Sequence, residues 1–461
     1  MRYIESLRAS ARVFFLDLPR AVRYRKNLFG IFPELYGVIC GLIKAGLIAV
    51  FFCGVSCPRA CAGEIVLTLD EALLTALKDN RQLAQGKAKE EAARAGVSLA
   101  NSAVLPTVDI SGTLEMTRGL YSKDVGELSE QVSVRQYLYK GGAISAAMRK
   151  SKFNLSAAQA SLSRDKQEVL LKVKKSFFTL VLAERYRRLS RFIAVSAKRH
   201  LDYVSELHRR GQASESEIIG QRSSLRSAMY LYSSAATQKK SAGEILANLL
   251  YLKSGDEITA AGRLRYAFRD TAYDAAFLKA AASRPELRLY EAEERSAEEA
   301  VKIARGFGRP SLKATLDYYS SNRLASGTEK NDNDHSVAGL TVSWPVFDGG
   351  QARAEVEAAI AALKASQAQR QQVIKDIATE LRQACLGLQD SLEALKAAEE
   401  EVKVYRDNLR AAQEKYRRGI ASLLDMQDAA LKYETAYFKK EQAVYAYMIA
   451  GMDFDKAIGG V

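Results

Sequence analysis

The sequence predicts a mainly α-helical protein with a membrane β-barrel portion, built from an internally duplicated chain. Three observations lead to this fold class. Landmark residues recur at a nearly fixed offset, four segments alternate strictly between apolar and polar residues, and long proline-free stretches favour helix. The chain has 461 residues, 48% hydrophobic and 26% charged, which indicates neither disorder nor a bundle of membrane-spanning helices.

The first 62 residues are typical of a signal or targeting segment. A basic stretch precedes the apolar run Leu35–Val55, and a small-X-small motif ends at Ala62. We expect cleavage after Ala62, which makes Gly63 the first mature residue. Two alternatives stay open at this stage: lipidation at Cys57, and retention of the run as an anchor helix.

Cysteine use agrees with export. Four of the 5 cysteines lie in the leader, so the mature chain keeps only Cys385 and forms no internal disulfide. Cys385 occupies an apolar helical position, where a small core residue is expected.

The formal net charge of +14 does not indicate a nucleic-acid partner. Lys and Arg alternate with Asp and Glu along the predicted helices, which is typical of solvated helix faces.

An internal duplication organises the mature chain. The pairs Leu83/Leu287 and Pro106/Pro310 are separated by 204 residues, whereas the glycine landmarks that follow are separated by 208. Four extra residues therefore lie in the second half, between its proline and its glycine pair. We predict a first repeat at 63–250, a linker at 251–270 and a second repeat at 271–461.

Each repeat should begin with one helix, followed by two strands. The strand pairs, 106–139 and 310–347, show a period of two over about ten to twelve residues, enough for a tilted strand to cross a bilayer. Aromatic residues near the strand ends would suit a membrane interface: Tyr137, Tyr139, Trp344 and Phe347. The same alternation also suits a water-soluble, half-buried sheet. If the strands span a bilayer, four are too few to close a barrel, so several chains must share one, and three would give twelve strands.

A glycine pair follows each strand pair. Gly141–Gly142 and Gly349–Gly350 would let the backbone bend between strand and helix. The long helices expected next, 142–208 and 350–416, would each be about 100 Å long at 1.5 Å per residue.

Heptad spacing in the second long helix indicates packing against neighbouring helices. The series is Leu381, Leu388, Leu395, Val402, Leu409 and Tyr416. Both long helices should end at an Arg-Gly step, at Gly211 and Gly419, and return as second helices to form antiparallel hairpins.

Motifs of catalysis are absent from the sequence. The three histidines do not show metal-ligand spacing with cysteines or carboxylates, and no phosphate loop, dinucleotide fingerprint or nucleophile elbow is present. We therefore expect no enzyme activity and no cofactor. A coiled-coil scaffold anchored by Leu35–Val55 would explain the helices, but not the paired strands.

From about Glu64 to Asp455, the chain resembles the TolC-like outer membrane efflux family. The resemblance rests on the duplicated plan, on a proline before each outgoing strand, and on the motifs "RPEL" (Arg284–Leu287), "WPVFDGG" (Trp344–Gly350) and "YRRGIASLLDMQDA" (Tyr416–Ala429). It implies a homotrimer in the outer membrane of a Gram-negative-type bacterium, whose 12-stranded barrel continues into a helical coiled-coil periplasmic tunnel.

Function and partners follow from the same resemblance. It implies an exit duct for multidrug efflux or type I secretion, which works with a periplasmic adaptor and an inner-membrane transporter of the RND, ABC or MFS type. The sequence does not indicate the cargo or the transporter class.

The resemblance also implies roles for residues at the periplasmic tip. Asp425 and Asp428 match the family's paired acidic ring, Tyr416 matches a tyrosine of the closed tip, and Glu217 matches an acid in the facing hairpin. The family's arginine is absent, because Ala421 stands there. From the residues alone, these acids equally suit stabilisation of a helix N-terminus.

The hairpin tips are the expected surface for the adaptor. Their central residues are Arg210 and Gly211 in the first hairpin, and Arg418 and Gly419 in the second.

Overall fold

The computed structural model describes residues 64–117, 125–252, 257–269, 272–323 and 333–460. The predictions for the leader, including cleavage after Ala62 and lipidation at Cys57, lie outside these residues. Within the described ranges, no helix is both long enough and apolar enough to cross a bilayer.

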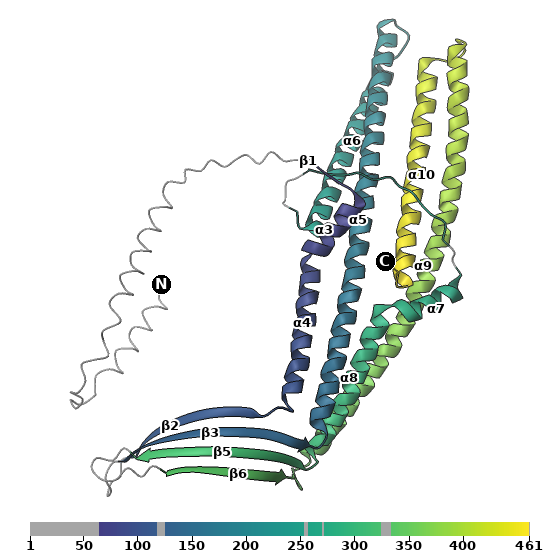
Figure 1. Ribbon diagram of the computed structural model, residues 1–461. Helices are drawn as coiled ribbons and strands as arrows, with labels where there is room; N and C mark the ends of the chain where they lie inside the picture. Colours follow the sequence, from purple (N-terminus) through teal and green to yellow (C-terminus); the bar gives the residue numbers. More distant parts are fainter. Residues whose placement is uncertain (1–63, 118–124, 253–256, 270–271, 324–332, 461) are drawn as a thin grey trace, which may run out of the picture. The chain divides into compact units, whose positions relative to one another are not determined.

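The order helix, strand, strand, long helix, helix occurs twice along the chain (Figure 1). In the first half the elements are α3 (Leu69–Asp79), α4 (Arg81–Ser102), β2 (Thr107–Thr117), β3 (Val125–Lys140), α5 (Ala143–Arg209) and α6 (Glu215–Leu250). In the second half they are α7 (Tyr273–Ser283), α8 (Pro285–Phe307), β5 (Ser311–Arg323), β6 (Asn333–Ser343), α9 (Gln351–Arg417) and α10 (Leu423–Ala457).

The opening helix of each half is broken, whereas the sequence predicted one continuous helix. Asn80 separates α3 from α4, because its side-chain oxygen caps the new helix by accepting the N–H groups of Gln82 (2.9 Å) and Leu83 (3.3 Å). Arg284 stands at the equivalent position before α8, which starts with Pro285 at a position that suits proline.

The predicted linker contains a short strand. Strand β4 (Glu257–Ala260) pairs in parallel with β1 (Glu64–Leu67), so the linker is tied to the start of the first repeat. Ile258 is buried in the core. The sequence did not reveal this pair, because four-residue strands carry little periodicity.

One core joins the two halves and contains residues of α5, α6, β4, α9 and α10. Its most completely buried large side chains include Phe177, Leu246, Leu381, Leu388 and Tyr447. Three members of the predicted heptad, Leu381, Leu388 and Leu395, are buried there. Cys385 is buried as well, as expected, and burial raises the pKa of its thiol.

A buried guanidinium at the start of α8 contacts both α9 and the end of α10. Arg284 is 3% exposed; its Nη1 lies 2.7 Å from Glu380 Oε2 on α9, and its Nε donates to the carbonyl of Ala457 (2.8 Å). Lys456 reaches the other oxygen of Glu380 at 3.0 Å. Burial alone would raise the pKa of Glu380, but these two cations outweigh it and lower the pKa.

Two further ion pairs hold the same end of α10 to other elements. Arg269 in the linker lies 2.6 Å from Asp455, and Lys175 on α5 lies 2.5 Å from Asp453. The C-terminal end of α10 is therefore bonded to α5, α8, α9 and the linker.

Replacing Arg284 should destabilise the fold strongly. In Arg284→Ala, Glu380 keeps its charge and its contact with Lys456 but loses the buried guanidinium, and the Ala457 carbonyl loses its donor. We therefore expect the free energy of unfolding to fall by roughly 2–3 kcal/mol, measured by denaturant titration of the detergent-purified protein. Arg353→Ala is the control. It removes a surface pair with Glu357 in which the arginine is 86% exposed, and a loss within about 1 kcal/mol is expected. Equal losses would contradict the proposed role of the buried ion pair.

Candidate functional site

The four long strands form one antiparallel sheet, in the order β2-β3-β5-β6. Pairing of β3 with β5 joins the two repeats. Strands β2 and β6 are the edges, and within the described chain each is paired along one side only. Each edge therefore presents backbone N–H and C=O groups that require another partner.

The two faces of this sheet differ in polarity. Residues paired across strands share a face, so Val108, Val134, Leu316 and Ala338 form one apolar row. Large side chains on this face are exposed, including Ile110 (80%) and Leu340 (72%). A contiguous exposed apolar face of this kind marks a surface that another phase or partner covers.

Polar side chains on the opposite face bond across the strands. Ser133 on β3 lies 2.5 Å from the carboxylate of Asp317 on β5, and Gln131 donates to the same carboxylate at 3.2 Å. Arg135 lies 3.8 Å from Asp109 on β2. These contacts link three of the strands and connect the first repeat to the second.

A bulge near the end of β3 separates two of the aromatic residues expected at a membrane interface. The register of β3 against β5 shifts between Tyr137 and Tyr139. Tyr137 pairs with Lys313 on the polar face, whereas Tyr139 pairs with Leu312 on the apolar face.

The glycine pairs lie between strand and helix, but the two copies are packed differently. All four glycines, Gly141, Gly142, Gly349 and Gly350, have positive φ angles between 58° and 88°, which favour glycine. A Cβ on Gly141 would overlap the carbonyl oxygen of Gly306, whereas the other three have open space.

The second turn has a cap that the first lacks. The Asp348 carboxylate accepts the N–H groups of Gly350 (3.0 Å) and Ala352 (2.8 Å), and these bonds, led by Ala352, lower its pKa. Strand β6 ends at Ser343, earlier than the predicted boundary at 347. Pro345 explains the early end, because proline has no N–H and restricts the residue before it.

The two hairpin tips have the same backbone structure. Gly211 and Gly419 both have φ 73°, and the residue after each glycine donates its N–H to a helix carbonyl five residues earlier, at 2.8 Å and 2.9 Å. Arg210 and Arg418 end the long helices and pair with glutamates one turn earlier, at 3.0 Å and 3.1 Å. These predicted docking residues are exposed at the tips.

Two of the predicted gate acids cap helices. Glu217 and Asp425 are the third residues of α6 and α10, and each accepts the N–H of the serine that precedes its helix. Asp425 also accepts the hydroxyl of Ser422 (2.7 Å), and the bonds from Ser422 lower its pKa. Both carboxylates remain exposed.

The other two predicted gate residues have different surroundings. Asp428 lies one turn further along α10, with Oδ1 3.2 Å from Nε2 of His200 on α5. Sequence reasoning missed His200, because the two residues are 228 positions apart and carry no shared motif. Tyr416 is 42% exposed, and within the described residues it does not bond to Glu217.

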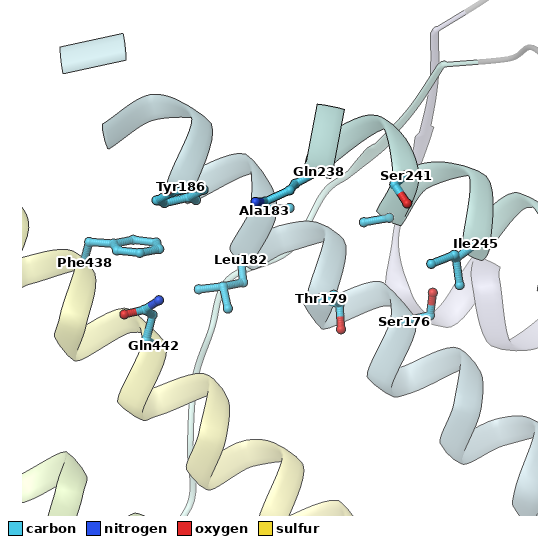
Figure 2. A pocket seen from close by; sticks show the side chains of 11 residues that line it. Ser176, Thr179, Leu182, Ala183, Tyr186, Gln238, Ser241, Ile245, Phe438 and Gln442 are labelled. Carbon is cyan, nitrogen blue, oxygen red and sulfur yellow. The ribbon is translucent and has the colours of Figure 1, made fainter. Parts of the chain in front are cut away.

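A groove of about 640 Å³ lies between α5, α6 and α10 (Figure 2). Tyr186 and Phe438 stand on one side of it, with ring centroids 5.3 Å apart. Its described lining contains no charged side chain and no histidine. Elsewhere in the described residues, no group of three or more His, Cys, Asp or Glu is placed to hold a metal ion.

A two-faced sheet with open edges, joined to long helical hairpins in a duplicated chain, is typical of outer-membrane channel proteins. The chain belongs to the outer membrane efflux protein family, whose model matches residues 72–250 and 278–460. This match confirms the resemblance inferred from the motifs. It also confirms the expectation that the chain is not an enzyme.

Individual relatives share between 20% and 25% of their aligned residues with this chain. Nodulation protein T of Rhizobium leguminosarum bv. trifolii is 22% identical over 372 residues, 77% of each chain. Protein CyaE of Bordetella pertussis is 25% identical over 325 residues, 69% of this chain and 68% of the relative. The fold is similar to the crystal structure of the Campylobacter jejuni CmeC outer membrane channel, with a TM-score of 0.74, 20% identity and 85% of each chain covered.

The two glycine turns should respond differently to the same substitution. Gly141→Ala adds a methyl group against the Gly306 carbonyl in addition to an unfavourable φ, so we expect stable protein in the membrane to be largely lost. Gly349→Ala meets open space and should cost only the φ penalty, about 1–2 kcal/mol. Heat-stability measurements on membrane extracts check this, and equal effects would show that the tight packing at Gly141 is unimportant.

Proposed function

We propose that three copies of this chain form a passive exit duct in the cell outer membrane, with a 12-stranded barrel that continues into a helical periplasmic tunnel. The duct would serve a tripartite efflux pump or a type I secretion system. The observation that carries the proposal is the sheet, because its edges are open and its faces differ in polarity.

Closing the sheet requires other copies. In a membrane the unpaired groups of β2 and β6 would lack water as a partner, and four strands are too few to close upon themselves. Pairing β6 of one copy with β2 of the next satisfies both edges, and three copies give twelve strands. The apolar face then contacts outer-membrane lipid, and the polar face with Asp317 and Arg135 lines the lumen.

The helical hairpins also carry surfaces that suit contact between copies. Met229 and Tyr230 on α6 are 61% and 71% exposed, and Leu386 and Val404 on α9 are 60% and 58% exposed. Each of these helices packs on a neighbour within the chain, α6 on α5, and α9 on α8 and α10. Their uncovered apolar positions would be buried if the α6 side of one copy met the α9 side of the next.

The tunnel would be gated at its periplasmic tip. In a trimer, Asp425 and Asp428 would place up to six carboxylates around a constriction, which attracts cations and opposes anions. Tyr416 and Glu217 would lie nearby, and the exposed tips around Arg210–Gly211 and Arg418–Gly419 would contact the adaptor. An inner-membrane transporter of the RND, ABC or MFS type would supply the energy, because the chain itself carries no nucleotide-binding motif.

Electrical recordings test the duct and its acidic ring together. The purified protein should conduct in planar bilayers, and a trivalent cation such as La³⁺ on the tip side should block it. In the double variant Asp425→Asn, Asp428→Asn, we expect the blocking concentration to rise by at least about tenfold, because the carboxylates that attract the cation are gone.

Glu215→Gln is the matched control, since Glu215 is another exposed acid in the first turn of a tip helix. Its block should match that of the original protein. Unchanged block in the double variant would refute the acidic ring, and absence of conductance in the unsubstituted protein would refute the duct.

The sheet orientation has its own test. Leu340→Arg places a charge on the apolar face and should cost roughly 2–4 kcal/mol of strand insertion if that face meets mid-bilayer lipid. Thr341→Arg, on the adjacent residue and opposite face, should be tolerated. The readout is the yield of heat-labile trimer in outer-membrane fractions, and a normal yield for Leu340→Arg would reject the orientation.

A further inference from the structure

A histidine and an aspartate connect the two hairpins of one protomer. His200 belongs to α5 in the first hairpin, and Asp428 belongs to α10 in the second. Nε2 of His200 lies 3.2 Å from Oδ1 of Asp428. Any movement that separates the hairpins at this level must break the contact.

Among the described residues, Nε2 of His200 makes no other polar contact. Nε2 is buried and has no aligned hydrogen bond among the described residues, so its close approach to Asp428 is its main polar contact. The imidazole side chain is 17% exposed and the carboxylate 50%, which places the pair at the edge of solvent. Salt in the solvent therefore screens the attraction between the two groups only in part. Because the carboxylate is half exposed, the pair can still exchange protons with water.

The groove beside the imidazole, about 450 Å³ in volume, is otherwise neutral. Its lining from α6 consists of Gln221, Ser223, Ser224, Ser227, Ala228 and Leu231. From α10 it contains Leu431, and Arg222 and Arg226 of α6 are not part of it. Lys198, Arg199 and Asp202 lie close along α5 itself. Among the described residues, the carboxylate within 4.0 Å of His200 is that of Asp428. The charged residues nearest along the two packed helices are Lys432, one turn after Asp428 on α10, and Glu217 and Arg222 on either side of Gln221 on α6.

Several other ionisable groups at the tip already make contacts within their own hairpins. Asp425 and Glu217 accept capping hydrogen bonds, and Ala421 stands where the family resemblance implies an arginine. His208 has Nδ1 2.8 Å from the carbonyl oxygen of Ala213 in its own hairpin, so it does not bridge the two hairpins. Histidine is the side chain whose charge ordinarily changes between pH 5 and 8.

We propose that the His200–Asp428 pair is a pH-responsive latch that holds the two hairpins of each protomer together when His200 is protonated and releases them when it is neutral. This inference rests on the proposed function and names a regulation of its gate. The sign follows from the charges: imidazolium attracts the carboxylate, whereas the neutral ring offers at most a weak, misaligned contact. Acid therefore favours the closed tip.

The test uses the full-length protein in planar bilayers at pH 5.5 and pH 7.5. For the unsubstituted channel we expect the open probability to be about fivefold higher at pH 7.5, a change that one ion pair of ordinary strength can supply. His200→Gln keeps a polar side chain of similar reach but cannot titrate, and it should be open to the same extent at both pH values. His200→Lys is charged at both values and should stay as closed as the original channel at pH 5.5.

Two further variants test the partner of His200 and the specificity of the pH response. Asp428→Asn removes the acceptor charge from α10 and should abolish the pH response without any change to His200. His208→Gln is the matched control, because it removes the other tip histidine, and it should keep the full response.

The outcomes separate the latch from the duct. A pH response that survives in His200→Gln or in Asp428→Asn, or that disappears in His208→Gln, would overturn the latch while the channel still conducts. Absence of any conductance from the unsubstituted protein would overturn the duct and the latch together. A response lost only in the His200 and Asp428 variants, with trimer yield unchanged, would support the latch.

Discussion

The buried ion pair between Arg284 and Glu380 is the interaction on which the arrangement of the helices depends. The Arg284 guanidinium is 3% exposed and is held by two acceptors, Glu380 at Nη1 and the Ala457 carbonyl at Nε, while its Nη2 has no hydrogen bond among the described residues. These contacts join the start of α8, the middle of α9 and the end of α10. Helix propensity alone contributes little to the stability of long helices, and it does not determine how they lie against one another. Contacts between helices, such as those of Arg284, are needed for that.

The tips of the two hairpins have the same backbone structure, whereas the turns between strand and long helix are packed differently in the two repeats. Gly141 packs against Gly306, while Gly349 faces open space and its turn depends instead on the Asp348 cap. Duplication preserved the geometry of the turn, but two different sets of contacts now stabilise it. An interaction found in one repeat therefore cannot be transferred to the other by the repeat offset alone.

The sequence predicted what depends on local pattern. The second helix predicted after the tip glycine Gly211 is α6, because glycine breaks the long helix there and a proline-free run follows. The break at Asn80 was missed, since an asparagine inside a helix-favouring run is ambiguous without the Leu249 carbonyl that its side chain contacts. The β1–β4 pair and the His200–Asp428 contact were missed because they join residues far apart in the chain, and one sequence carries no record of such pairing.

The two aspartates of the tip illustrate how similar residues one turn apart take different roles. The backbone of α10 fixes Asp425, because a capping carboxylate that leaves its position exposes the N–H and hydroxyl groups of Ser422 to solvent without their partner. Asp428 does not cap the helix, and its carboxylate instead lies beside His200 of the other hairpin. A movement of the hairpins can therefore change the surroundings of Asp428 while Asp425 keeps its own. In the proposed gate, Asp425 would provide a constant charge, whereas the surroundings of Asp428 would depend on the position of α5.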